Sequence, residues 1–211
     1  MNQSNGQTRP NAGGPAACWS CHGPVDPRAL FCHTCGLIQP SRPLDHFARL
    51  ALRRDYDLDA ADLERQYFGF QRRFHPDRFA GKSSTEKAHS LQHATSLNEA
   101  YETLKSPLHR ARYLLELLGR AVIEEDQTTS DPALLLEAME MRETLAEARD
   151  RAAVAGIVAD AETKIADCRS GLSTAFATDD LDTATELTLR LTYLEKFLHE
   201  CKAHDKPHGA A

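Results

Sequence analysis

Four cysteines near the N-terminus stand in two Cys-x-x-Cys pairs, a spacing suited to metal binding. Cys18 and Cys21 form the first pair, and Cys32 and Cys35 form the second after ten intervening residues. Each pair can turn two thiolates toward one point, and two pairs complete the tetrahedron that zinc accepts. Because four protein sulfurs leave no open coordination position, such a site is structural and not catalytic. We therefore predict a structural zinc site and no organic cofactor.

Other uses of the cysteines stay open on the sequence alone. A thiol oxidoreductase would use the pairs as reactive, metal-free dithiols, but no βαβ pattern surrounds either pair. Four cysteines can also hold an iron–sulfur cluster. A nucleic-acid-binding zinc module is disfavoured, because Arg28 is the only basic residue between Cys18 and Cys35. Cys168 and Cys201 fall on apolar helical stripes, and we expect them to be inert core thiols.

A His-Pro-Asp tripeptide at residues 75–77 is the second feature that could carry chemistry. It follows a helical stripe of apolar side chains, and its proline ends that helix, because proline lacks an N–H and clashes with the preceding turn. Arg72, Arg73 and Arg78 concentrate positive charge on both sides of the tripeptide.

A third group of residues gives one predicted helix more apolar side chains than its core stripe needs. At about 100° per residue, Leu135, Leu136 and Met139 point away from that stripe and lie beside Glu140 and Glu143. The five residues form either an exposed patch for a partner or a surface packed against the preceding domain. Spacing alone leaves both interpretations open.

The three groups of residues must be positioned by secondary structure, and the amino-acid composition favours helices. Aromatic residues make up only 7% of the 211 residues, and β-branched runs are scarce, which argues against a sandwich or barrel. We predict an all-α fold class, in which Asp59 caps one helix and three long amphipathic helices form the C-terminal bundle. The expected segments are a disordered tail (1–17), a tetracysteine zinc module (18–40), a helical domain (44–120), a linker (121–130), a three-helix bundle (131–205) and a second tail (206–211).

Charge and hydropathy exclude several classes of partner. The chain has a net charge of −6, and residues 121–211 alone carry 9 basic and 19 acidic side chains. An acidic C-terminal region makes broad nucleic-acid binding improbable and suits either a basic partner or plain solvation. No run of about 18 apolar residues exists, and the first residues lack the apolar core of a signal peptide. We therefore expect no membrane partner and a cytoplasmic location.

Four stretches in the same order resemble a known family. They are residues 73–79 (RFHPDRF), 97–104 (LNEAYETL), 106–115 (SPLHRARYLL) and 139–143 (MEMRE). Together they resemble a J-domain, and more closely the HscB-type J-proteins of iron–sulfur cluster biogenesis. The resemblance covers roughly residues 44–205, and the cysteine array is similar to a zinc module found on some members.

One stretch departs from the family pattern. The first helix of a J-domain usually begins with a Leu-Phe-Gly-Leu type of sequence, whereas residues 44–54 read LDHFARLALRR. The register of the chain before Asp59 is therefore open.

The resemblance implies a fold, partners and roles. The fold would be a helical J-domain followed by a three-helix bundle, and the protein would be a co-chaperone and not an enzyme. Binding to a DnaK/HscA-type ATPase chaperone would involve His75, Pro76, Asp77, Arg72, Arg73 and Arg78. Binding to an IscU-type iron–sulfur scaffold protein would involve Leu135, Leu136, Met139, Glu140, Glu143 and Tyr193.

Two alternatives remain beside this interpretation. A J-protein for general unfolded clients predicts a broad peptide-binding surface instead of a compact patch. A bacterial cytosol is the expected location, and the mitochondrial matrix is the alternative if a presequence has been removed.

Overall fold

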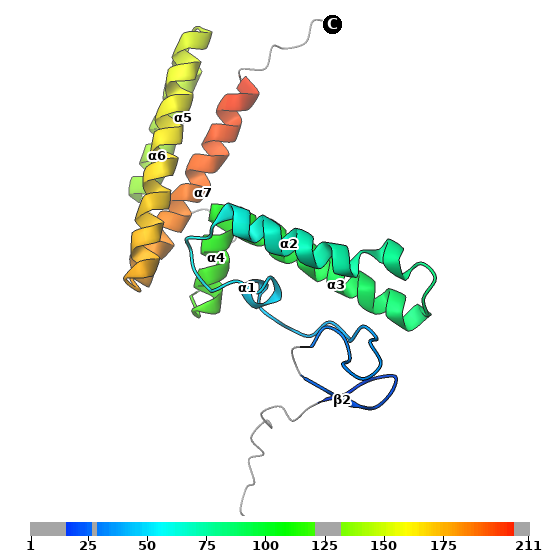
Figure 1. Ribbon diagram of the computed structural model, residues 1–211. Helices are drawn as coiled ribbons and strands as arrows, with labels where there is room; N and C mark the ends of the chain where they lie inside the picture. The colour runs from blue at the N-terminus through cyan, green and yellow to red at the C-terminus, as the bar shows by residue number, and fades with distance from the viewer. Residues whose placement is uncertain (1–15, 27–28, 121–131, 205–211) are drawn as a thin grey trace, which may run out of the picture.

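The computed structural model describes residues 16–26, 29–120 and 132–204, and it consists of two helical arms set at an angle (Figure 1). The cysteine module, residues 16–40, lies beside the first arm. The N-terminal arm comprises α1 (His46–Arg49), α2 (Ala60–Phe74), the 3-10 turn η1 (Pro76–Phe79), α3 (Ser84–Lys105) and α4 (Pro107–Leu117). The C-terminal arm comprises α5 (Pro132–Glu147), α6 (Arg151–Ala177) and α7 (Leu181–His204). The all-α prediction is confirmed.

The only sheet in the described residues belongs to the cysteine module. Strands β1 (Ala16–Ala17) and β2 (Pro24–Val25) pair antiparallel, with Ala16 opposite Val25. The sequence placed Ala16 and Ala17 in the disordered tail, whereas the hairpin around the first cysteine pair orders them. The rest of that tail, the linker at 121–130 and the tail at 206–211 lie outside the described residues.

Side-chain caps define the helices of the N-terminal arm. The Asp59 carboxylate accepts hydrogen bonds from the first backbone N–H groups of α2, as its position predicts. Ser83 and Glu86 form a capping box at the start of α3. The open register before Asp59 resolves into a single turn, α1, whose Phe47 is fully buried and which is followed by Ala51 in the left-handed region (φ 54°).

One apolar core runs from the N-terminal arm into the adjacent half of α6 and α7. The ring of Tyr56 stacks on Phe176 with 5.3 Å between centroids, and the guanidinium of Arg112 donates to the Thr192 hydroxyl at 2.9 Å. The fully buried Leu172 belongs to this shared core. The two arms are therefore joined by side-chain packing as well as by the chain.

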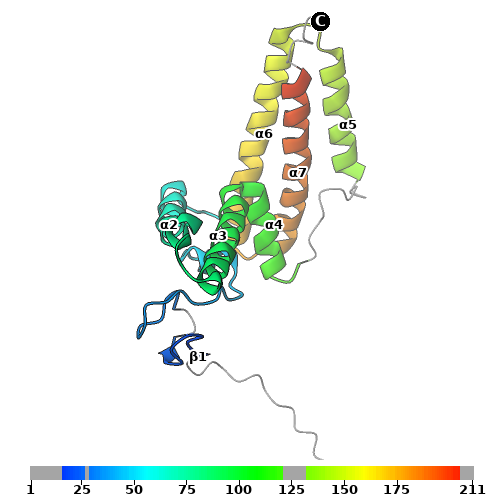
Figure 2. The same ribbon diagram turned by 90° about the vertical axis from the view of Figure 1, so that its right-hand side faces the viewer.

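The C-terminal arm is built on the long antiparallel pair of α6 and α7, and α5 lies along α7 (Figure 2). A bidentate pair between Arg190 and Glu137, with N–O distances of 2.7 and 3.1 Å, ties α7 to α5. Cys168 and Cys201 are both buried in apolar surroundings, and burial raises the pKa of each thiol. Their prediction as core thiols is confirmed.

A buried histidine joins the cysteine module to the N-terminal arm. His93 is 4% exposed, and its ring stacks on Phe74 with 4.3 Å between centroids. Its Nε2 lies 3.0 Å from the backbone oxygen of Gln39. Burial lowers the pKa of His93 from 6.5, and nearby Arg49 and His89 act in the same direction against the Gln39 hydrogen bond.

We predict that protonation of His93 weakens the fold in mild acid. Because the pKa of His93 is lower in the folded state, the unfolded state binds the proton more readily. The stability from this group is complete above its ordinary pKa of 6.5 and is lost as pH falls through the lowered pKa. H93Q should therefore show a smaller drop in Tm between about pH 7 and about pH 5 than the wild type does, measured by circular dichroism.

The exposed His199 provides the matched control for this experiment. H199Q should keep the pH dependence of the wild type. An H93Q protein whose Tm falls as steeply as that of the wild type would contradict the prediction.

Candidate metal centre and interaction surfaces

The four cysteines predicted to bind metal converge in one cluster. Their Sγ atoms all lie within 4.8 Å of one another. The distance is 3.7 Å between the sulfurs of Cys18 and Cys35, and also between those of Cys21 and Cys32. A tetrahedron with metal–sulfur bonds of about 2.3 Å has edges of about 3.8 Å, whereas a disulfide bond measures about 2.05 Å. The donor set therefore has the size of a metal site, and the four residues could hold one metal ion.

Two tight turns carry the cysteine pairs. After Cys32, Gly36 has a φ of 74°, and its N–H donates to the Cys32 carbonyl at 2.9 Å. After Cys18, the corresponding position is His22, which has a φ of 57° and donates to the Cys18 carbonyl at 3.1 Å. The left-handed conformation costs little at Gly36 and more at His22. A glycine after the second cysteine pair is the residue type that such a turn favours, whereas the histidine after the first pair gives no such signal.

The hydrogen bonds around the cluster stabilise the thiolate of Cys18 more than that of Cys35. The backbone N–H of Cys21 is the main cause that lowers the pKa of Cys18 to about 6, and the Gln39 amide adds an N–H···S bond at 3.4 Å. The backbone N–H of Leu37 favours the Cys35 thiolate, but burial and the neighbouring sulfurs outweigh it and raise the pKa of Cys35 to about 12. Four adjacent thiolates require a cation to balance their charge, and a soft divalent ion fits this donor set.

The cysteine module docks on the N-terminal arm through aromatic rings. Phe31 stacks on Phe74 with 5.7 Å between centroids and 4° between planes. Trp19 meets the ring of His89 edge-on at 5.7 Å, and the Arg73 guanidinium lies 5.3 Å from the centroid of Phe31. These contacts place the module next to the end of α2, where the His-Pro-Asp tripeptide begins.

The tripeptide is exposed at the turn between α2 and α3. His75 Nδ1 accepts the backbone N–H of Asp77 at 3.3 Å and so caps η1. The same nitrogen lies 3.5 Å from the Asp77 carboxylate. The side chain of Asp77 is 90% exposed. Pro76 fixes the first position of the turn.

The three arginines predicted around the tripeptide are brought together by the fold. Arg72, Arg73 and Arg78 are all exposed, and the Arg78 guanidinium donates to the Arg72 carbonyl at 3.0 Å. Within the described residues, none of the three has a carboxylate partner within 4 Å. The positive charge at this end of the arm is therefore available to an outside group.

The apolar residues of α5 form an exposed patch. Leu136 is 57% exposed and Met139 is 68% exposed, while Leu135 is half-buried and Glu140 and Glu143 are exposed. Leu136 and Met139 are too exposed to be covered by the N-terminal arm. Of the two interpretations that the sequence left open, the structure supports the exposed one. We call these five residues the α5 patch.

Tyr193 lies in the seam between α5 and α7. It is half-buried and lines a small hollow with Ala138 and Arg142. On the helical wheel of α5, Arg142 lies next to Leu135. Tyr193 therefore borders the α5 patch on its α7 side.

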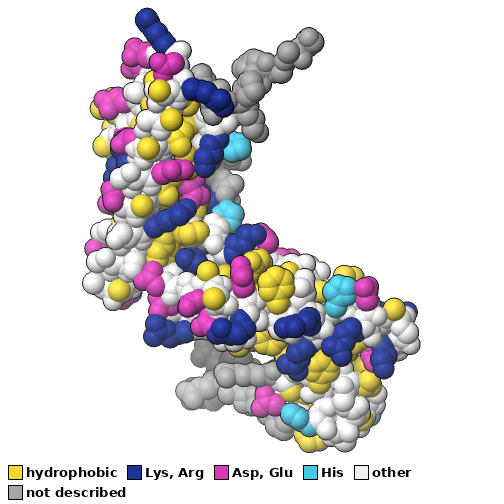
Figure 3. Space-filling view, turned by 45° about the horizontal axis from the view of Figure 1, so that its top comes forward, with side chains coloured by type: hydrophobic (Ala, Val, Ile, Leu, Met, Phe, Trp, Pro, Cys, Tyr) yellow, Lys and Arg dark blue, Asp and Glu magenta, His cyan; other side chains and the backbone are white. Residues whose placement is uncertain are grey.

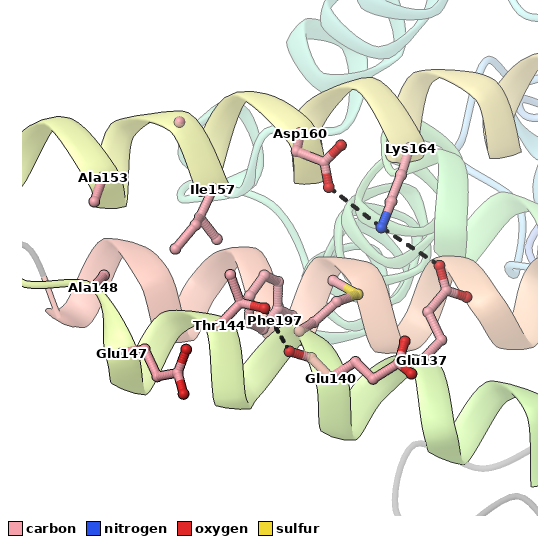
Figure 4. Close-up of a pocket in the computed structure, with 12 residues that line it drawn as sticks. Glu137, Glu140, Thr144, Glu147, Ala148, Ala153, Ile157, Asp160, Lys164 and Phe197 are labelled. Atoms are coloured by element: carbon pink, nitrogen blue, oxygen red, sulfur yellow. Dashed lines mark hydrogen bonds and ion pairs between the residues drawn. The ribbon is translucent and has the colours of Figure 1, made fainter.

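A groove of about 660 Å³ between α5 and α6 borders the patch on the other side (Figure 4). Glu140, Glu147 and Asp160 stand along its rim, and Ile157 and Phe197 lie among the apolar residues that line it. Sequence analysis missed this groove. The signal that could have found it is the pair of small residues Ala153 and Gly156, three positions apart on one face of α6, which leave space on the side that lines the groove.

Among the helices that the structure describes, none is long and apolar enough to span a bilayer.

Comparisons with known proteins decide the family. The chain is 36% identical to the human iron–sulfur cluster co-chaperone protein HscB over 194 residues, which cover 90% of this chain and 83% of the human protein. The chain belongs to the HscB family of iron–sulfur cluster co-chaperones. Residues 130–202 also match the family model described as the HscB C-terminal oligomerisation domain.

Solved structures agree with this assignment. The crystal structure of human co-chaperone protein HscB superposes with a TM-score of 0.85 at 35% identity, covering 90% of this chain and 99% of that one. The chaperone HscB from Vibrio cholerae gives a TM-score of 0.69 at 32% identity, covering 77% of this chain and 98% of that one. The predicted HscB-type fold is confirmed.

Metal content provides a test of the cysteine cluster. We predict one bound metal ion per chain, which C32S should lose, because three sulfurs and a hydroxyl bind a soft ion much more weakly. Elemental analysis of the purified protein measures the ion. C168A removes a buried thiol outside the cluster and should keep the full metal content. Equal metal content in C32S and the wild type would contradict the prediction.

Proposed function

We propose that this HscB-family protein binds an IscU-type iron–sulfur scaffold through its C-terminal arm and delivers it to a DnaK-type chaperone. The His-Pro-Asp tripeptide would stimulate the ATPase of that chaperone. The observation that carries the proposal is the exposed α5 patch, which lies on a different arm from the exposed tripeptide. One chain can therefore hold two partners at once. ATP hydrolysis belongs to the chaperone, so the protein acts as a co-chaperone and not as an enzyme.

Charge supports the chaperone side of the proposal. The exposed Asp77 carboxylate is free to form a charge-assisted hydrogen bond with an arginine of the chaperone. Arg72, Arg73 and Arg78 present positive charge around it, which speeds encounter with an acidic surface. Pro76 and the cap from His75 hold the turn in shape before the partner arrives.

The exposed apolar area of α5 supports the part of the proposal that concerns scaffold binding. Leu136 and Met139 expose large apolar side chains to water, and an exposed apolar patch rimmed by polar groups marks an interaction site. Glu140 and Glu143 would select for a basic rim on the scaffold, and Tyr193 would close the α7 edge of the site. The compact size of the patch favours a folded scaffold over general unfolded clients.

The metal proposed for the cysteine cluster is zinc. Four sulfurs at tetrahedral spacing suit this ion, and such a site supplies folding energy to a segment with little core of its own. The fully enclosed core of the module consists of Cys18, Val25 and Cys32. Zinc held by Cys18, Cys21, Cys32 and Cys35 would keep the module folded and therefore docked on the N-terminal arm.

The proposed role of the tripeptide can be tested by replacing its single carboxylate, that of Asp77. D77N should abolish stimulation of the ATPase of a purified DnaK-type chaperone, because the amide cannot make the charge-assisted bond. Asp77 is exposed, so the fold and Tm should not change. E64Q, an exposed carboxylate on the same arm, is the control and should stimulate normally. Stimulation retained by D77N would refute the role of the tripeptide.

The scaffold site can be tested by truncating the α5 patch. The double variant L136A/M139A should bind a purified IscU-type scaffold more weakly, by about 1 kcal/mol or more for each anchor residue, in calorimetric titrations. L91A removes an equally exposed leucine from α3 and should bind normally. An unchanged affinity of the double variant would place the scaffold elsewhere on the chain.

A further inference from the structure

A cleft of about 370 Å³ separates the cysteine module from the end of the N-terminal arm that carries the tripeptide. One wall comes from the module and the other from the segment on both sides of residues 75–77. The lining residues that matter here are Phe31, Leu37, Arg73, Arg78, Lys82 and Glu86.

The wall from the N-terminal arm is positively charged. Arg73, Arg78 and Lys82 have no carboxylate within 4 Å among the described residues. Glu86 is the one acidic residue among the described residues that line the cleft; its carboxylate accepts the Ser83 N–H at 3.0 Å and the Ser83 hydroxyl at 2.8 Å, and it also attracts Lys82. The three cations outnumber this carboxylate, so the wall keeps a net positive charge. The space-filling view shows Lys and Arg side chains gathered on the N-terminal arm next to the module (Figure 3).

The wall from the module combines the apolar Phe31, Leu37 and Ile38 with Cys35 and Gly36, and it is held in place. Phe31 is fixed between the ring of Phe74 and the guanidinium of Arg73. Ile38 is 1% exposed and belongs to the core of the N-terminal arm, and Trp19 Nε1 donates to the Ile38 carbonyl at 2.7 Å. The cleft is therefore preformed, so a ligand would not have to order it on binding.

We propose that the cysteine module and the segment around the tripeptide form one binding surface for an acidic segment of the DnaK-type chaperone. The inference rests on the proposed function and adds a second wall to its chaperone site. Three cations, which outnumber the Glu86 carboxylate and face a largely apolar wall, suit a peptide whose carboxylates alternate with apolar side chains. Arg73 and Arg78 line the cleft and also flank the tripeptide, so the two surfaces are continuous.

A nucleic acid is the other acidic ligand to consider, and the rest of the chain opposes it. The protein has a net charge of −6, and the C-terminal region carries the excess of acidic groups. A long polyanion would be repelled there, whereas a short acidic segment of a protein would meet only the cleft.

Lys82 is the sharpest test, because it lines the cleft without belonging to the tripeptide and is exposed. K82E should raise the concentration needed for half-maximal stimulation of a purified DnaK-type chaperone by about tenfold and leave maximal stimulation unchanged. K87E makes the same charge reversal on the exposed surface of α3, outside the cleft, and should shift this concentration much less.

The apolar wall gives a second, independent variant. F31A should raise the same concentration by about fivefold to tenfold, because it removes the ring that faces the cleft. Metal content and Tm, measured on the same sample, report whether the module is still folded. Should F31A lose its metal, L37A tests the same wall without breaking the Phe31–Phe74 stack.

The outcomes separate this inference from the proposed function. Normal stimulation by K82E and by the folded wall variant, with D77N inactive, would overturn the inference and leave the proposed function standing. No stimulation by the wild type would overturn both. A K82E protein that loses binding to a single-stranded DNA probe but stimulates the chaperone normally would assign the cleft to nucleic acid instead.

Discussion

The packing of the N-terminal arm against α6 and α7 is the interaction on which the rest of the structure depends. Leu172 and Leu191 are fully buried in the core that both arms share, and each large apolar side chain buried in this way contributes about 1.5–3 kcal/mol. Tyr56 and Phe176 add a stacked pair at the same junction. Because the contact is made by interlocking side chains, it fixes the angle between the arms and keeps the tripeptide and the α5 patch on separate parts of the molecule (Figure 1).

A second line of contacts connects the cysteine cluster to the tripeptide. The Gln39 amide donates to the sulfur of Cys18, while the Gln39 carbonyl meets His93. His93 stacks on Phe74, the residue before the tripeptide. Among the described residues of the cysteine module, three enclosed residues form its core, and this packing is too small to hold the module together. Metal binding and docking on the N-terminal arm are therefore complementary sources of its stability.

Features set by nearby residues could be predicted from the sequence, and features set by distant contacts could not. The Asp59 cap, the cysteine tetrad and the outward direction of Leu136 follow from spacing within one turn or one helix. The stacking of Phe31 on Phe74 joins residues 43 positions apart, and no periodicity reveals such a pair. The small residues of α6 hint at the groove between α5 and α6, but its width depends on how two helices pack, which no local pattern gives. The roles of the α5 patch and the tripeptide remain predictions.

The angle between the arms has a kinetic consequence for the proposed function. A flexible linker would let a bound scaffold sample a large volume around the chaperone, and the local concentration would fall as the linker lengthened. In the proposed function a rigid junction would remove that averaging, because each chain would hold the scaffold and the chaperone at one separation and in one orientation. The rate of their encounter would then depend on the shape of this protein more than on the abundance of either partner.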